Sequence, residues 1–133
     1  MYDVVIVGAG PAGSTAANLL ARAGVRALTL EKDVFPRFHI GESLLPIDLP
    51  IFARLGVVMD RTRWQYKQGA EFIDERTGEF AFFSFADGLD GTPSHAWQVD
   101  RSQFDAMLCD VARAHGADIR FGERVTGVDI HPD

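Results

Sequence analysis

The chain has 133 residues, of which 47% are hydrophobic, and this is enough for one globular domain with a core of its own. Thirteen basic against nineteen acidic residues give a net charge of -6 at pH 7, and the basic residues form no stripe. We therefore expect neither nucleic acid nor an anionic membrane surface as a partner.

Cysteine content and hydropathy exclude further classes of protein. The single cysteine, Cys109, cannot form an intrachain disulfide, and no cluster of cysteine and histidine has the spacing of a zinc site, so we expect no metal. The start lacks the basic segment of a signal peptide, and no apolar run approaches the roughly 18 residues of a membrane helix. These absences predict a cytoplasmic protein in a reducing compartment.

The most informative stretch is a short apolar run followed by closely spaced glycines. Residues 4–7 are typical of a strand, and three glycines follow at G-x-G-x-x-G spacing before a helical pattern begins. Such glycines permit a tight turn, let the backbone approach a pyrophosphate, and let helix and strand pack closely. The pyrophosphate then lies at the helix N-terminus, where unpaired N–H groups favour anions. We expect these residues to bind a dinucleotide: Gly8, Gly10, Pro11, Ala12, Gly13 and Ser14.

A second strand is predicted at residues 25–30, after a helix that ends near Gly24. Glu31 follows this strand, about 20 residues after the glycines, where dinucleotide folds place the carboxylate that binds the ribose hydroxyls. The alternative is an ordinary solvated acid at a strand end. A carboxylate here also disfavours a 2′-phosphate, so NADP is not expected. Residues 1–34 thus form a βαβ unit.

Residues 33–46 have no periodicity but are apolar at Phe35, Phe38 and Ile40, so we expect an ordered, packed loop. A helix is predicted over 44–55, with Ser43 as its N-cap, Pro46 in its first turn and a kink or break at Pro50. Arg37 and His39 in the loop are candidate contacts to an anion or flavin. A surface salt bridge and a satisfied polar histidine are the alternatives.

The next elements leave the βαβ pattern. Residues 69–74 and 79–85 alternate apolar and polar around a turn that contains Gly78, which predicts a β-hairpin. A short strand is predicted over 96–99. Lys67, just ahead of the hairpin, either points into a pocket or is a solvated lysine at a strand end.

The last third predicts a helix and returning strands. Asp100 is a strong N-cap, Gln103 completes a capping box, and an apolar face continues to about residue 115. Cys109 falls beside this face and is expected to pack inertly. Arg101 is a cation in the first turn, against the helix dipole, and suggests a nearby phosphate or carboxylate. Simple solvation of the side chain is the alternative. Residues 117–121 and 124–130 are predicted strands, and a strand edge with no successor suggests part of a longer domain.

Four stretches together resemble the FAD-dependent oxidoreductases of the para-hydroxybenzoate-hydroxylase-like fold, and among them the flavin-dependent halogenases. VVIVGAGPAGSTAANLLARAG with LTLEK looks like their FAD-binding unit, and FPRFHIGESLLP is similar to the segment that follows in halogenases and geranylgeranyl-reductase-like proteins. KQGAEF resembles the halogenase pattern K-x-G-A-x-F. The stretch from WQVDRSQFD onward is similar to the V-x-R-x-x-F-D-x-x-L helix of the fold.

The resemblance implies an α/β fold: a Rossmann-like, GR2-type FAD-binding domain with an inserted antiparallel hairpin, incomplete at its C-terminus. Its parts would be the βαβ unit (1–34), a strap-like loop and helix (35–55), inserted strands (66–99), and a helix with returning strands (100–133). The glycines would hold the FAD pyrophosphate and Glu31 the adenosine ribose, while Arg101 would lie against FAD. Gly41, Glu42 and Ser43 would form the strap beside the flavin. Lys32 and Arg37 are further expected FAD contacts.

The implied reaction uses reduced FAD, O₂ and a halide ion, and it produces hypohalous acid that reaches Lys67, whose motif matches the catalytic lysine. A separate flavin reductase would supply the reduced FAD. Pro11 and Ser14 depart from the G-x-x-A-G-W of tryptophan halogenases, which favours a phenol- or pyrrole-like aromatic substrate, either free or bound to a carrier protein.

Other readings stay open on the sequence. The halogenase signature W-x-W-x-I-P, the second FAD motif and the halide site would all lie beyond residue 133. An FAD-dependent reductase of the geranylgeranyl-reductase type, an aromatic monooxygenase, and a truncated flavin-binding module without turnover share most of the same features. The 133 residues alone are expected to be inactive.

Overall fold

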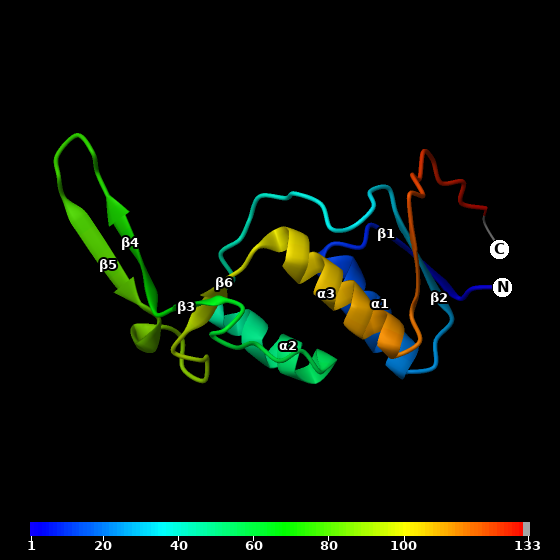
Figure 1. Ribbon diagram of the computed structural model, residues 1–133, viewed down its shortest axis with the longest axis horizontal. Coiled ribbons are helices and arrows are strands. Elements are labelled where there is room, and N and C mark those ends of the chain that lie inside the picture. Colours follow the sequence, from blue (N-terminus) through cyan, green and yellow to red (C-terminus); the bar gives the residue numbers. More distant parts are fainter. Residues whose placement is uncertain (132–133) are drawn as a thin grey trace. The chain divides into compact units, whose positions relative to one another are not determined.

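The computed structural model describes residues 1–131, and its internal contacts divide the chain into two compact units. The first unit contains residues 1–39 together with those from 101 onward, and the second contains residues 40–100. Figure 1 labels the elements of both.

The first unit is built on a parallel sheet of three strands in the order β1-β2-β7. Ile6, Thr29 and Ile119 lie side by side across the three strands. A helix precedes β2 and another precedes β7, which is the βαβ connection expected of parallel strands. This confirms the predicted Rossmann-like α/β fold. Its elements are β1 (Val4–Val7), α1 (Pro11–Arg22), β2 (Ala27–Glu31), α3 (Arg101–Ala114) and β7 (Asp118–Phe121).

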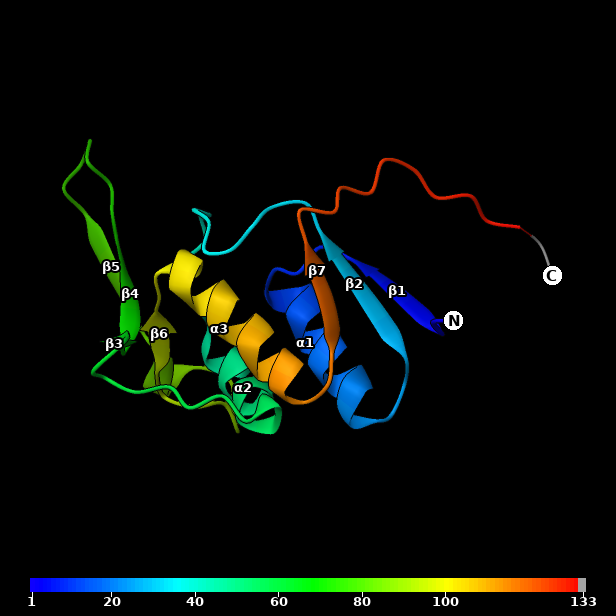
Figure 2. The same ribbon diagram turned by 45° about the vertical axis from the view of Figure 1, so that its right-hand side comes forward.

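Helices α1 and α3 lie side by side on one face of this sheet (Figure 2). Small buried residues of both helices, Ala17 and Ala112, let them approach closely, and both pack in the core that contains Ile119. Alternate residues of β1 point to the opposite face, where Val5 and Val7 are 57% and 62% exposed. The core of this unit therefore lies between the sheet and the two helices.

The second unit contains two separate pairs of antiparallel strands. The predicted hairpin is confirmed as β4 with β5, and the Asp74 amide donates to the Glu79 carbonyl at 2.8 Å where the turn begins. The other pair joins β3, which the sequence patterns did not reveal, to β6. The elements of the second unit are the 3₁₀ turn η1 (Pro46–Asp48), α2 (Leu49–Leu55), β3 (Gln65–Lys67), β4 (Gly69–Ile73), β5 (Phe80–Ser84), the 3₁₀ turn η2 (Phe85–Asp87) and β6 (Ala96–Gln98).

The predicted helix over 44–55 is wrong at its start. Ser43 is not an N-cap, because its backbone forms an antiparallel bridge to Gln98. A 3₁₀ turn begins only at Pro46, and α2 begins at Leu49. Each proline sits in a first turn, where its missing N–H removes no helical hydrogen bond. The break expected at Pro50 is therefore present as the boundary between these two short helices.

Three further predictions fail in whole or in part. Residues 124–130 form no strand, because within residues 1–131 no segment pairs with them and a strand requires a hydrogen-bonded neighbour. In the loop after β2, Phe35 packs on Phe121 with ring centroids 4.8 Å apart, as expected, whereas Phe38 and Ile40 are 80% and 78% exposed. Strand β2 begins at Ala27 rather than at residue 25, since the Val25 amide still bonds the carbonyl of Leu20 in α1.

Candidate cofactor-binding site

The glycine-rich turn between β1 and α1 is shaped by two local constraints. Gly8 has φ +93°, a conformation that side chains disfavour, and its amide donates to the Leu30 carbonyl at 2.8 Å. A Cβ on Gly13 would lie 1.9 Å from the Gly8 carbonyl oxygen, so only glycine allows α1 to approach the turn this closely. The first and third glycines are thus required by the fold itself.

Gly10 has a different environment from the other two glycines. It is the N-cap of α1, with φ -63° and no side-chain hydrogen bond to the first amides of the helix. A Cβ at this position would contact only the Arg37 Nη2, at 3.8 Å. Neither conformation nor packing explains a glycine here, whereas close approach of a bound anion to the helix N-terminus would.

Glu31 ends β2 as a nearly buried carboxylate, 5% exposed. Its Oε2 accepts the Ala9 amide at 2.8 Å, and its Oε1 accepts the Asp33 amide at 2.9 Å, so it ties the glycine turn to the end of β2. Burial by itself would raise the pKa of Glu31, but the two amide bonds and the charge of Arg37 outweigh it and hold the pKa below its ordinary value. The side chain is therefore an anionic acceptor at neutral pH.

A cavity of about 230 Å³ opens at the carboxyl ends of β1 and β2, directly beside Glu31. Ligands of open α/β sheets bind outside the carboxyl ends of the strands. The cavity is lined by Val7, Gly8, Leu30, Glu31, Lys32, Glu123, Arg124 and Val125.

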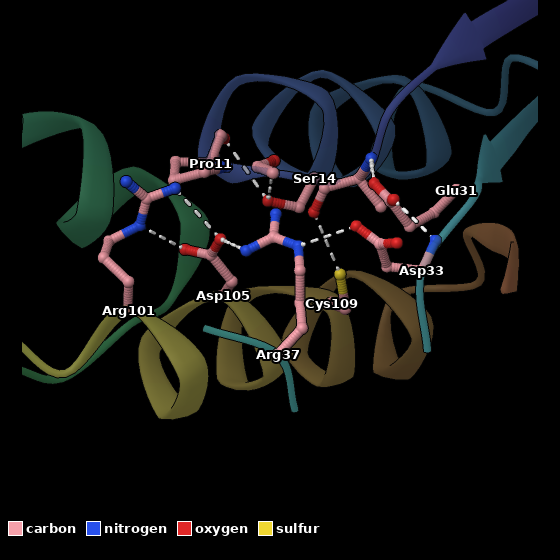
Figure 3. A network of polar contacts seen from close by, with 10 residues as sticks. Pro11, Ser14, Glu31, Asp33, Arg37, Arg101, Asp105 and Cys109 are labelled. Carbon is pink, nitrogen blue, oxygen red and sulfur yellow. Dashed lines mark hydrogen bonds and ion pairs between the residues drawn. The ribbon is translucent and has the colours of Figure 1, made fainter. Parts of the chain in front are cut away.

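A cluster of charged side chains gathers on Asp105 of α3, which is fully buried (Figure 3). Arg101 binds it through two hydrogen bonds, Nε to Oδ1 at 2.7 Å and Nη2 to Oδ2 at 3.0 Å. Arg37 Nη1 lies 3.1 Å from the same Oδ2, at the distance of an ion pair. The carboxylate suggested by the cation at the start of α3 is therefore Asp105.

Sequence reasoning gave Asp105 no role, although it is the aspartate of the V-x-R-x-x-F-D-x-x-L pattern. The spacing of Arg101 and Asp105, one helical turn apart with opposite charges, was the available signal. Arg37 lies far from both in the sequence, so only the fold reveals that it joins the cluster.

Two residues of the turn and its neighbourhood face inward. The Ser14 hydroxyl is buried and donates back to the Gly10 carbonyl at 2.9 Å. The Cys109 thiol is buried, lies 3.4 Å from the Ala9 carbonyl oxygen, and has a pKa that burial raises to about 12. Cys109 therefore packs inertly, as predicted. Among the other predicted contacts, Lys32 and Ala12 are exposed and Pro11 begins α1.

The second unit holds the remaining predicted residues. Glu42 and Leu44 of the strap-like segment bond β6 and the residue after it, since the Leu44 amide donates to the Trp97 carbonyl and the Val99 amide donates to the Glu42 carbonyl, both at 2.9 Å. Lys67 is the last residue of β3, and its Nζ donates a hydrogen bond to the Ser43 hydroxyl. The same Nζ lies 5.4 Å from the ring centre of Phe85. The structure thus brings together the predicted Lys67 and Ser43, while Gly41 and Glu42 are exposed.

The arrangement of strand, glycine turn, helix and acidic strand end is shared by many dinucleotide-binding proteins, so comparison with known proteins decides the family. A sequence profile described as tryptophan halogenase matches residues 3–93, which is more than half of the chain. The chain belongs to the tryptophan halogenase family.

The similar proteins are named as halogenases or as a chlorinase. The flavin-dependent halogenase armH3 of Armillaria mellea is 38% identical over 98% of this chain and 26% of its own length. The 1H-pyrrole-2-carbonyl-(peptidyl-carrier protein) chlorinase of Pseudomonas fluorescens is 35% identical over 97% of this chain and 33% of its own length. Among solved structures, the myxobacterial chondrochloren halogenase CndH superposes with a TM-score of 0.81 at 39% identity, over 91% of this chain and 28% of that one.

These comparisons confirm the predicted family and fold. The chain spans only a quarter to a third of the length of these relatives.

Among residues 1–131 no helix is both long and apolar enough to cross a membrane. In the same residues no group of three or more histidine, cysteine, aspartate or glutamate side chains is placed to hold a metal ion.

Proposed function

We propose that this chain is the FAD-binding part of a flavin-dependent halogenase, which uses reduced FAD, O₂ and a halide ion to halogenate an aromatic substrate. The observation that carries the proposal is the glycine turn with Glu31 buried at the end of β2, in a chain that belongs to the tryptophan halogenase family. The relatives named above are flavin-dependent halogenases and a pyrrole chlorinase.

The residues of the first unit fit FAD. Gly10 leaves space at an N-terminus of α1 that no side chain caps, which suits a pyrophosphate. Glu31 is an anionic acceptor beside a cavity, which suits ribose hydroxyls. Arg37 and Arg101 supply the positive charge for the phosphates. The other contacts expected from this unit are Gly8, Pro11, Ala12, Gly13, Ser14 and Lys32. From the second unit, Gly41, Glu42 and Ser43 are the residues that the family resemblance suggests for the flavin ring.

When bound and reduced, FAD would supply with O₂ the oxidising power that turns a halide ion into an electrophilic halogen. Lys67 is the residue that we expect to hold this electrophile, either by a hydrogen bond from Nζ or as a haloamine, against the aromatic carbon. Its neighbours Ser43 and Phe85 limit the positions of the ammonium group.

The substrate that we propose is a phenol- or pyrrole-like ring, either free or delivered on a carrier protein, as the name of the Pseudomonas fluorescens relative describes for that enzyme. A separate flavin reductase is the proposed source of reduced FAD. The proposed location is the cytoplasm, where the unpaired Cys109 stays reduced.

The test is a product assay on the complete gene product with reduced FAD, chloride or bromide, and a panel of phenols and pyrroles. Halogenated product from the wild type is expected, with loss of halogenation in Lys67→Ala while FAD binding remains. Arg76→Ala is the matched control, because Arg76 is a cation of the same unit whose side chain is 87% exposed in the hairpin turn. This variant should halogenate normally.

Four results would change the proposal. Hydroxylated products alone would indicate an aromatic monooxygenase, and saturation of an isoprenoid substrate added to the panel would indicate a reductase of the geranylgeranyl-reductase type. FAD binding without any turnover would indicate a flavin-binding module. A Lys67→Ala protein that halogenates like the wild type would remove the role assigned to Lys67.

A further inference from the structure

Asp105 is a buried carboxylate to which the proposed function assigns no role. It is 0% exposed on α3, where an isolated charge would be strongly destabilising. Arg101, one turn earlier on the same helix, compensates it by two parallel hydrogen bonds of 2.7 and 3.0 Å. This pair alone satisfies both carboxylate oxygens.

A second guanidinium nevertheless reaches the same carboxylate. Arg37 Nη1 lies 3.1 Å from Asp105 Oδ2, and the Arg37 side chain is 16% exposed. The two arginines come from segments far apart in the sequence, the loop after β2 and the start of α3, and meet only at Asp105 (Figure 3). Arg37 is therefore not needed to satisfy Asp105, since Arg101 already bonds both carboxylate oxygens, and its place beside this carboxylate calls for another reason.

The position of the Arg37 guanidinium group shows what else it can reach. Its guanidinium lies over the Phe35 ring, 4.6 Å from the centroid, and its Nε is 3.6 Å from the half-exposed Asp33 carboxylate. Held at these points and at Asp105, the group places Nη2 3.8 Å from the position that a Cβ would take on Gly10. Gly10 is the glycine of the turn whose presence neither conformation nor packing explains.

We propose that Asp105 is a positioning residue of the cofactor site, whose one carboxylate holds Arg37 and Arg101 together so that their guanidinium groups bind the diphosphate of the dinucleotide at Gly10. Asp105 is negatively charged, as the diphosphate is, so it acts through the two arginines and does not contact the diphosphate itself. This inference rests on the proposed binding of FAD but not on halogenation.

The experiment measures the dissociation constant of FAD by flavin fluorescence for the complete gene product and its variants. Asp105→Asn keeps the shape of the side chain but removes the charge that holds both arginines. Loss of hydrogen bonds to a charged group predicts FAD binding weaker by about tenfold or more. Unchanged FAD affinity in a folded Asp105→Asn protein would overturn the inference.

A double-mutant cycle separates positioning from a merely structural role. If Asp105 acts through Arg37, Asp105→Asn should weaken FAD binding much less in an Arg37→Met background than in the wild type. Equal losses in both backgrounds would mean that Asp105 only supports the fold, which would contradict the proposal.

A second variant keeps the test decisive where Asp105→Asn does not fold. Arg101→Lys retains the charge but cannot form two parallel bonds to Asp105, so FAD affinity should again fall by about tenfold. Wild-type affinity in Arg101→Lys would refute the need for a held guanidinium. If the wild type itself binds no FAD, the proposed function fails, whereas normal wild-type binding with unaffected variants would sink only this inference.

Discussion

The three glycines of the turn should respond differently to substitution by alanine, and Gly13 offers the sharpest test of the packing argument. Alanine is a better helix former than glycine by about 1 kcal/mol, so Gly13→Ala in α1 would stabilise an unconstrained helix. In this chain the new Cβ would lie 1.9 Å from the Gly8 carbonyl oxygen and 2.9 Å from its carbon. Both are backbone atoms, which cannot rotate away.

The clash with the Gly8 carbonyl group determines whether Gly13→Ala stabilises or destabilises the chain. Real Cβ atoms essentially never come within 3.0 Å of another heavy atom, so α1 would have to move by more than about 1 Å from β1. Overpacking of this kind costs about 3 kcal/mol, which leaves a net loss of about 2 kcal/mol after the helix propensity is included. Urea unfolding of the chain, followed by circular dichroism, measures this difference directly.

Gly10→Ala is the matched control, because it adds the same methyl group three residues earlier. Its Cβ meets only Arg37 Nη2 at 3.8 Å, and its φ of -63° suits any residue, so the stability should fall by less than about 1 kcal/mol. FAD binding to the complete gene product should weaken by about tenfold or more, because the methyl group stands where a pyrophosphate would approach.

Two results would refute this reasoning. A Gly13→Ala chain as stable as the wild type would show that the close approach of α1 to the turn is not a constraint. A Gly10→Ala protein with unchanged FAD affinity would show that no ligand approaches the backbone at this glycine.

Three further predictions follow from single contacts. Glu31→Gln should destabilise the chain by about 1–3 kcal/mol at pH 7 by weakening the bonds from the Ala9 and Asp33 amides. The pKa of Glu31 is lowered in the folded state, so its charged form stabilises the fold above the ordinary value of 4.5. The gap between wild type and variant in urea titrations should therefore narrow as the pH falls through 4.5, and a gap independent of pH would contradict it. Cys109, with a pKa raised to about 12, should resist iodoacetamide at pH 8 in the folded chain and react in urea, as mass spectrometry would show. Ser43→Ala should lower halogenation turnover by about tenfold, with recovery in Ser43→Thr, because Lys67 loses its hydrogen-bond acceptor. Equal turnover in Ser43→Ala and Ser43→Thr would argue against a role for the hydrogen bond between Lys67 and Ser43.

Local patterns in the sequence were sufficient for the parts of the fold that are built from consecutive residues. The strand before the glycines, the helix after them, Glu31 at the end of β2 and the apolar face of α3 all follow from periodicity and spacing over one βαβ unit. Gly8 and Gly13 belong to the same group, because their roles depend on the turn that they form with their neighbours. Inert packing of Cys109 followed from its place beside the apolar face.

Tertiary structure decided what depends on residues far apart in the chain. Ser43 is a residue type that often caps a helix N-terminus. In the folded chain its backbone is extended and forms an antiparallel bridge with Gln98 instead. Residues 124–130 have the composition of a strand but no pairing partner among the described residues, and hydrogen bonding to a neighbour is what makes a strand. The sequence also does not show that Arg37 and Arg101 share the carboxylate of Asp105. Spacing predicts contacts within a helix or a turn, whereas contacts between distant segments arise only when the chain has folded. The proposed diphosphate site depends on contacts of this second kind, because Arg37 reaches Asp105 only in the folded chain.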